Sequence, residues 1–199
     1  MTTFLLIRHG AHLLGGETIA GRTPGVRLSP LGEEQVATMI ERVAALPVAA
    51  VYSSPVERVQ QTAAPLARRL GLSLQVREEL SEIDFGEWAG RKLSELKGDV
   101  RWGRWNHFRS GTRAPGGERM LEVQHRIVRF MLDLGGDDRT IALVSHGDVI
   151  KAAVAYFLGV PLDLMLRIEI GLASTSIVQV GAGGAWVLCV NNTPDLPLP

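Results

Sequence analysis

Apolar residues gather along the chain into six short runs that are typical of buried β-strands. They cover residues of about 3–8, 48–52, 73–77, 140–145, 174–180 and 185–190. The last two runs show the alternation or β-branching expected of strands. The glycine-rich turn between Gly181 and Gly184 predicts that these two form an antiparallel hairpin.

Between most of these runs, apolar residues recur at the spacing of amphipathic helices. Ser54 and Glu57 have the spacing of a capping box around Pro55, so they predict a sharp helix start. Pro65 should kink or interrupt that helix, because proline lacks an amide hydrogen and clashes with the preceding turn. The predicted helices cover residues of about 30–45, 55 onward, 117–134 and 148–158.

The alternation of strands and helices favours an α/β fold. Helical crossovers between parallel strands cover both faces of a sheet. We therefore predict a three-layer α/β/α sandwich whose central sheet is mostly parallel, and mixed because of the final hairpin. One domain over residues 1–193 fits the length of 199 residues and the hydrophobic content of 46%, and residues 194–199 are predicted to be a loose tail.

Composition argues against several classes of partner. Lys plus Arg and Asp plus Glu each number 21, so no net field attracts the chain to nucleic acid or to an anionic membrane. No stretch approaches the roughly 20 apolar residues that span a bilayer, and the start lacks the basic segment of a signal peptide. The sequence thus predicts a cytoplasmic protein without nucleic-acid or membrane partners. Its single cysteine, Cys189, is interpreted as a packed strand residue.

Cationic and imidazole side chains follow the ends of three predicted strands. Arg8 and His9 end the first, and Arg58 lies in the first turn of the helix after the second. His146 follows the fourth run, and Gly147 then opens a helix. Because the carboxyl ends of parallel strands meet at one edge of a sheet, we expect these residues to lie together. Such an electropositive rim favours a dianionic phosphoryl group.

The same surroundings predict the protonation states of the reacting groups. Nearby positive charge disfavours imidazolium, so a histidine at this rim should be neutral and nucleophilic. Bound phosphate would push a neighbouring carboxylic acid toward its protonated form. Glu82, in the segment 80–86, would then protonate a leaving alcohol. The predicted pocket needs neither a metal nor another cofactor.

Five sequence blocks occur in an order typical of one protein family. The blocks are Leu6 to Gly10, Ser53 to Pro55 with Arg58 and Thr62, Glu82 to Gly90, Pro115 to Glu118, and Val144 to Gly147. Together they resemble the histidine phosphatase superfamily, also called the phosphoglycerate mutase-like family, over nearly the whole chain. The resemblance implies a phosphoric monoester hydrolase that acts on a small phosphate ester in two displacement steps.

The resemblance also implies a role for each residue of the predicted site. His9 would be the nucleophile that becomes phosphorylated. Glu82 would give a proton to the leaving group and then take one from the attacking water. The residues expected to hold the phosphoryl group are Arg8, Arg58, His146 and Gly147.

The chain departs from the family pattern just after its signature. Where the family often has polar residues, this chain has Ala11, His12 and Gly15. The loss of an amide side chain there should remove one contact to phosphate. The turn that follows, of about 20 residues, is long enough to be a binding loop. Arg22 and Thr23 lie in it, and we predict that they donate hydrogen bonds to the substrate.

Residues 101–109 mix cations with aromatic side chains. They predict either a lid that reads the leaving group or an amphipathic surface helix with Trp102 and Trp105 packed inward. Asp84 and Asp148 are expected to orient or cap groups near the site, without a catalytic role.

Several alternative functions stay open at this point. They are a phosphoglycerate mutase-type phosphotransferase, a phosphohistidine protein phosphatase, and a catalytically weak module that binds phosphorylated ligands or proteins. A metal hydrolase built on His9, His12, His146 and a carboxylate is disfavoured, because Arg8 and Arg58 would repel a divalent cation. A homodimer through a sheet edge or helix face would be ordinary for such a chain.

Overall fold

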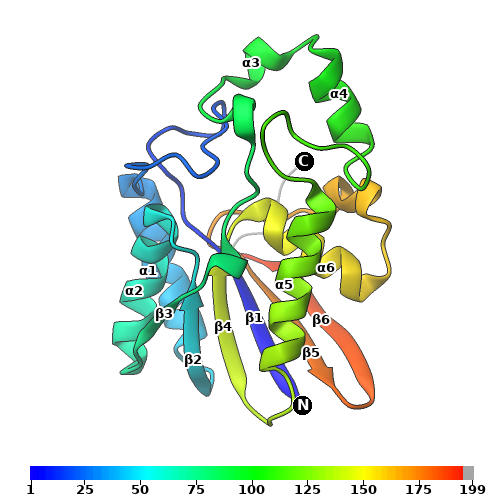
Figure 1. Ribbon diagram of the computed structural model, residues 1–199. Coiled ribbons are helices and arrows are strands. Elements are labelled where there is room, and N and C mark those ends of the chain that lie inside the picture. The colour runs from blue at the N-terminus through cyan, green and yellow to red at the C-terminus, as the bar shows by residue number, and fades with distance from the viewer. Residues whose placement is uncertain (195–199) are drawn as a thin grey trace.

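Six strands form one sheet in the computed structural model, which describes residues 1–194 (Figure 1). The strands are β1 (Thr2–Arg8), β2 (Val48–Ser53), β3 (Leu74–Val76), β4 (Thr140–Ser145), β5 (Thr175–Gly181) and β6 (Gly184–Asn192). Every predicted strand is confirmed. Of the predicted tail at 194–199, all but Pro194 lies outside the described residues.

The strand order places the ends of β1, β2 and β4 side by side. The order across the sheet is β3-β2-β4-β1-β5-β6. The first four strands of the chain run parallel, and β5 and β6 pair antiparallel, as predicted for a mixed sheet. Arg8 pairs with Ser145 and Ser53 pairs with Val144, so the carboxyl ends of these three strands share one edge.

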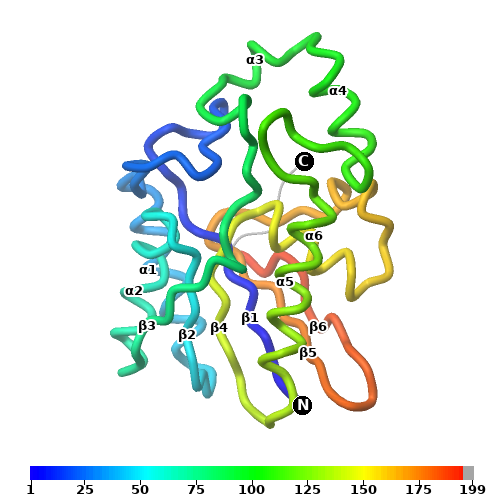
Figure 2. The backbone as a smooth tube through the Cα atoms, in the orientation of Figure 1, coloured from blue at the N-terminus to red at the C-terminus, as the bar shows by residue number. Residues whose placement is uncertain are grey.

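Helices cover both faces of the sheet, which confirms the three-layer α/β/α sandwich (Figure 1 and Figure 2). Successive strand residues point to opposite faces, so Leu5 and Ile7 join one core while Phe4 and Leu6 join the other. The first core packs under α1 (Pro30–Val43) and α2 (Glu57–Leu70), and the second under α5 (Met120–Leu134) and α6 (Gly147–Leu158). None of the helices within residues 1–194 is both long enough and apolar enough to cross a bilayer.

The remaining helices are short and lie mostly between β3 and β4. They are η1 (Glu78–Leu80), η2 (Gly86–Trp88), α3 (Leu93–Leu96), α4 (Val100–His107) and η3 (Leu162–Arg167). Residues 93–109, here named the cap segment, lie beyond the carboxyl edge of the sheet (Figure 1). Trp105 is fully buried there and stacks on Trp102 at 5.3 Å between ring centroids. The helix is therefore confirmed as α4, with Trp105 packed inward and Trp102 only partly buried, while the lid that reads the leaving group stays a prediction.

The start of α2 differs from the prediction. The capping box predicted a start at Pro55, but the helix begins at Glu57, with Val56 at its N-cap. Ser54 is buried, and its Oγ lies 2.9 Å from Nε2 of His146. The hydroxyl group of Ser54, which the sequence pattern assigned to helix capping, thus forms a tertiary hydrogen bond with His146. Pro65 lies inside α2 without interrupting it.

The start of α5 also differs, because residues 115–118 pack against the segment that follows Glu82. The amide of Glu118 donates to the carbonyl oxygen of Asp84 at 2.9 Å. A Cβ atom on Gly117 would lie 2.1 Å from that same oxygen, so the approach requires glycine. The helix predicted from residue 117 consequently begins at Met120, and the backbone contact holds the loop that carries Glu82.

Candidate active site

A cavity of about 240 Å³ lies at the carboxyl edge of β1, next to the cap segment. The residues that line it include Arg8, His9, His12, Gly15, Arg58, Glu82, Trp102, Arg109, Gly147, Asp148 and Lys151. His146 is fully buried behind it, in contact with Arg58. The structure thus brings Arg8, His9, Arg58, Glu82 and His146 together, although they are far apart in sequence.

His9 presents a lone pair at Nε2. Its Nδ1 lies 2.8 Å from the carbonyl oxygen of Gly10, which can only accept, so Nδ1 carries the proton. Nε2 accepts a hydrogen bond from Nε of Arg58 at 3.2 Å. Burial, followed by the charges of Arg58 and Arg8, holds the pKa of His9 well below its usual range. The imidazole is therefore neutral at physiological pH and nucleophilic at Nε2.

Arg58 lies at the centre of the cluster and is 1% exposed. Its Nη2 donates to the carbonyl oxygen of Gly21 at 2.9 Å and to Nδ1 of His146 at 3.1 Å. Its Nη1 is buried without a hydrogen-bond partner in the part of the chain that the structure describes. A buried guanidinium nitrogen without a partner is costly, and an anion oxygen in the cavity would satisfy it.

Arg8 is held over the first turn of α6. Its Nη1 donates to the carbonyl oxygen of Ile170 at 2.6 Å, while its buried Nε has no partner among residues 1–194. A Cβ atom on Gly147 would lie 3.2 Å from that Nε, so glycine at this position gives the guanidinium room. Arg8 and the N-terminus of α6 thus present positive charge to the same cavity.

His146 is oriented by contacts at both ring nitrogens. Because Arg58 donates to Nδ1, Nε2 carries the proton and donates to Oγ of Ser54 at 2.9 Å. Burial, followed by the charge of Arg58, keeps the pKa of His146 well below its usual range. Its ring lies 5.4 Å from that of His9, so two neutral imidazoles meet edge to face at the site.

Glu82 brings a carboxyl group to this cluster, with Oε2 at 3.6 Å from Nδ1 of His146. Its Oε1 accepts a hydrogen bond from the amide of Ile83 at 3.0 Å. Burial, and then the charge of Asp148, raise the pKa of Glu82 to about 7. The group can therefore give or take a proton near neutral pH.

Arg22 and Thr23 lie outside this cavity, contrary to the interpretation of their loop as a substrate-binding segment. Nε of Arg22 donates to the carbonyl oxygen of Glu82 at 2.7 Å, and its Nη2 pairs with Glu118 at 2.8 Å. Thr23 and Arg22 line a separate cavity beside Pro55. Arg22 thus supports the backbone at Glu82. Substrate binding by Arg22 and Thr23 stays a prediction, and this geometry does not favour it.

Arg126 is a supporting residue that the sequence analysis missed. Its Nη2 donates to the carbonyl oxygens of Ser81 at 2.7 Å and of Glu82 at 3.1 Å. It also lies 3.4 Å from Glu118, which joins it to Arg22. A cation beside the apolar stripe of α5 was the only local signal, and it does not reveal a partner 44 residues away.

His12 lines the cavity at the position where the family pattern departs, with its ring 5.7 Å from that of His9. Burial, and then Arg58 and Arg8, lower its pKa to about 4, so it is neutral as well. The geometry does not fit the metal-hydrolase alternative, because Arg58 bonds to both His9 and His146. Across residues 1–194, no group of three or more His, Cys, Asp or Glu side chains is placed to hold a metal ion.

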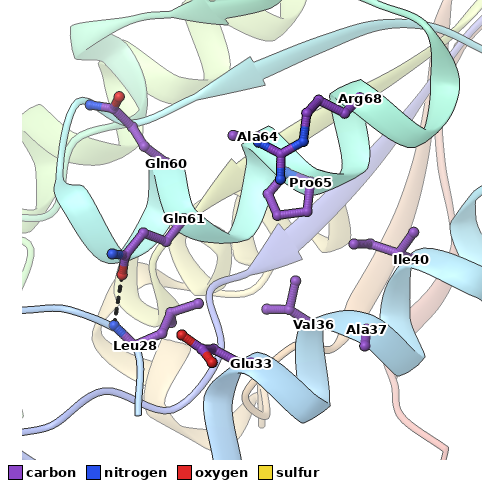
Figure 3. A pocket seen from close by; sticks show the side chains of 10 residues that line it. All are labelled: Leu28, Glu33, Val36, Ala37, Ile40, Gln60, Gln61, Ala64, Pro65 and Arg68. Atoms are coloured by element: carbon purple, nitrogen blue, oxygen red, sulfur yellow. Dashed lines mark hydrogen bonds between the residues drawn. The ribbon is translucent and has the colours of Figure 1, made fainter. Parts of the chain in front are cut away.

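A larger groove of about 480 Å³ lies between α1 and α2 (Figure 3). Val36 and Ile40 of α1 face Pro65 of α2 across it, and its charged lining residues are Glu33 and Arg68. This groove lacks the cluster of cations and imidazoles that a phosphoryl group requires. The smaller cavity around His9 is therefore the candidate active site.

Known proteins are similar in sequence to this chain. A bifunctional protein of Mycobacterium tuberculosis is 35% identical over 200 residues, which cover 96% of this chain and 54% of that protein. The chain thus spans about half the length of this relative. A glucosyl-3-phosphoglycerate phosphatase of Mycolicibacterium vanbaalenii is 30% identical over 170 residues, or 80% of this chain and 75% of that protein.

Solved structures share the fold. A mycobacterial glucosyl-3-phosphoglycerate phosphatase superposes with a TM-score of 0.86 at 25% identity, covering 96% of this chain and 99% of the other. A variant of phosphoserine phosphatase from Entamoeba histolytica, in complex with phosphoserine, has a TM-score of 0.85 at 26% identity, covering 98% of each chain. Residues 4–193 match the family model of the histidine phosphatase superfamily (branch 1), and the chain belongs to that superfamily.

Proposed function

We propose that this chain is a metal-independent phosphatase that hydrolyses a small phosphate monoester through a phosphohistidine at His9. The observation that carries this proposal is the buried, neutral imidazole of His9, whose Nε2 lone pair lies 3.2 Å from Nε of Arg58. Relatives named as phosphatases of glucosyl-3-phosphoglycerate and of phosphoserine support it. The cytoplasmic location and the homodimer stay predictions from the sequence.

The first step transfers the phosphoryl group to the enzyme. A dianionic phosphoryl group would accept hydrogen bonds from the free nitrogens of Arg58 and Arg8, at the positive end of α6. Nε of Arg58 gives up its hydrogen bond to Nε2 of His9 and turns to the phosphoryl oxygens. The freed Nε2 lone pair then forms the P–N bond while the P–O bond to the leaving group breaks. The leaving oxygen takes the proton from Glu82, which becomes a carboxylate. Nδ1 stays protonated and keeps its bond to the carbonyl of Gly10, which orients the ring.

The second step returns the enzyme to its starting state. A water molecule attacks phosphorus from the side that the alcohol has left, and it gives a proton to the carboxylate of Glu82. The P–N bond breaks, and its electron pair returns to Nε2 of His9. A pKa near 7 suits Glu82 to both roles, because the group changes its protonation state at little cost near neutral pH.

The dimensions of the cavity favour a small substrate. Its volume of about 240 Å³ lies below the roughly 300–1,000 Å³ that is typical of pockets for drug-sized ligands. Besides the cations and imidazoles, the lining includes Trp102 and Lys151. These side chains suit a leaving alcohol that carries further polar groups.

A screen of phosphate esters tests the proposal, with the wild type and His9→Ala compared in the presence of a chelator. His125→Ala is the matched control, because His125 is exposed on α5. We expect the wild type and the control to release phosphate and to carry an acid-labile phosphoryl group when quenched. His9→Ala should do neither.

Three outcomes would contradict the proposed function or its mechanism. Transfer of the trapped group to a second phosphoglycerate instead of water would identify a mutase. Tight ligand binding without release of phosphate or a trapped adduct would identify a binding module. Equal hydrolysis by the wild type and His9→Ala would overturn the proposed mechanism.

A further inference from the structure

A buried ion pair joins the cap segment to the helix that follows His146. Nη1 of Arg109 donates to Oδ2 of Asp148 at 2.7 Å, and Nη2 donates to Oδ1 of Asn106 at 3.0 Å. The guanidinium lies over the ring of Trp105, 3.8 Å from its centroid, and Arg109 is 4% exposed. The proposed two-step reaction assigns no task to this pair, although both residues line the catalytic cavity.

Asp148 is the second acidic residue in the lining of that cavity, beside Glu82. It lies in the first turn of α6, where the helix dipole stabilises its negative charge. Two carboxyl groups that share one poorly solvated cavity do not both ionise readily. Asp148 has a counter-charge at 2.7 Å in Arg109 and lies at the positive end of α6, whereas the carboxyl group of Glu82 has no such ion pair with an arginine among the described residues.

We propose that Asp148 is a positioning residue that holds the proton on Glu82, and that Arg109 limits the strength of this effect. The proposal rests on the function inferred above, in which Glu82 must be protonated to release the alcohol. It gives the cap segment an electrostatic part in catalysis, because Arg109 belongs to that segment.

The other charges around Glu82 favour its ionised form. Arg8 approaches its carboxyl from β1 and Arg58 approaches it from α2, and both lower its pKa. Burial and the charge of Asp148 outweigh them and raise the pKa of Glu82 to about 7.

Three further groups pack around Glu82 from other elements. His146, after β4, is neutral and close to the carboxyl group. Arg126 of α5 and Arg22 of the long loop contact its carbonyl oxygen. In the part of the chain that the structure describes, Asp148 is thus the acidic neighbour that opposes the two nearest arginines.

Substitutions of Asp148 and of Arg109, which should shift the pH profile in opposite directions, test this inference. The ratio kcat/KM falls as pH rises through the pKa of the required acid. Asp148→Asn removes the negative charge, so the falling limb should move to lower pH, by on the order of one unit. Arg109→Met leaves Asp148 without its counter-charge, so the limb should move to higher pH. Arg109→Lys keeps the charge and should restore most of the wild-type profile.

A control pair and a second readout separate this inference from simpler explanations. Arg129→Met and Asp133→Asn break an exposed ion pair of α5 and should leave the profile unchanged. The titration of Glu82 itself is read from the carboxyl infrared band that Glu82→Gln removes, in the resting enzyme and without substrate.

The infrared titration decides the inference even when activity is absent. We expect the midpoint of Glu82 to fall in Asp148→Asn and to rise in Arg109→Met. An unchanged midpoint in Asp148→Asn overturns the inference, and so do shifts of the two variants in the same direction. A wild type that shows these shifts but hydrolyses no ester would overturn the proposed function and leave the electrostatic coupling intact.

Discussion

Gly117→Ala offers a sharp test of how the acid is positioned. The new Cβ atom would lie 2.1 Å from the carbonyl oxygen of Asp84, whereas Cβ atoms essentially never approach closer than 3.0 Å. The segment that carries Glu82 must therefore move by about 1 Å, and a displacement of that size costs about 10²-fold in rate. Overpacking should also lower the free energy of unfolding by about 1–3 kcal/mol.

Two kinetic measurements distinguish an effect on Glu82 from an effect on phosphate binding. We expect kcat for an alkyl phosphate to fall about 10²-fold in Gly117→Ala. The inhibition constant of inorganic phosphate should change by no more than about threefold, because Gly117 packs against Asp84 and Gly86, whereas Arg8 and Arg58 belong to β1 and α2. Gly103→Ala in α4 is the matched control, since its Cβ would meet no atom within 4 Å.

Two results would refute this reasoning. A folded Gly117→Ala variant with wild-type kcat would mean that the contact between residues 84 and 117 does not position Glu82. A loss of phosphate affinity in proportion to kcat would mean that the substitution disrupts the whole cavity. Thermal unfolding of the same samples identifies a variant that is merely unfolded.

Three further substitutions probe the site and the cap. Burial raises the pKa of Glu82 from 4.5 to about 7, so its ionisation lowers the stability of the fold progressively between about pH 4.5 and 7, and the full cost is present above pH 7. Glu82→Gln should therefore abolish the fall of kcat/KM above about pH 7 yet stabilise the protein at pH 8 by about 3 kcal/mol, measured by urea unfolding. Ser54→Ala leaves Nε2 of His146 without its acceptor and should cost about 1–3 kcal/mol in the same assay. Trp105→Ala removes a fully buried ring and should cost about 3–5 kcal/mol, seen as a lower Tm.

Each of these expectations has a contrary outcome. Equal stabilisation by Glu82→Gln at pH 5 and pH 8 would mean that ionisation of Glu82 does not oppose folding. Wild-type stability of Ser54→Ala would show that another group satisfies His146. A Tm of Trp105→Ala within a degree of the wild type would mean that the cap segment does not share the main core.

The strands and the edge that carries the site could be predicted because their signals are local. Buried parallel strands are continuous apolar runs, and the residues after β1 and β4 must emerge at one edge. The predicted starts of α2 and α5 were wrong because contacts between residues far apart in sequence decide where these helices begin. The hydroxyl of Ser54 is taken by His146, 92 residues away, and Gly117 is held against Asp84.

Partners of charged residues were the least predictable part of the site. Arg22 was assigned to substrate from the length of its loop, whereas in the structure it pairs with Glu118, 96 residues away. The pair of Arg109 and Asp148 spans 39 residues. Single-sequence periodicity reports which face of a helix is buried, but it carries no information on which opposite charge meets a given arginine.

The pairing of β1 with β4 has a consequence for the diversification of such proteins. Arg8 pairs with Ser145, so backbone hydrogen bonds between adjacent strands set the spacing of His9 and His146. Insertions or exchanges in residues 93–109 leave that ladder untouched. Selectivity for the alcohol can therefore change during evolution without any change in the spacing of the two histidines. Exchanging residues 93–108 between relatives, with Arg109 kept, should transfer substrate preference while the reaction itself stays the same.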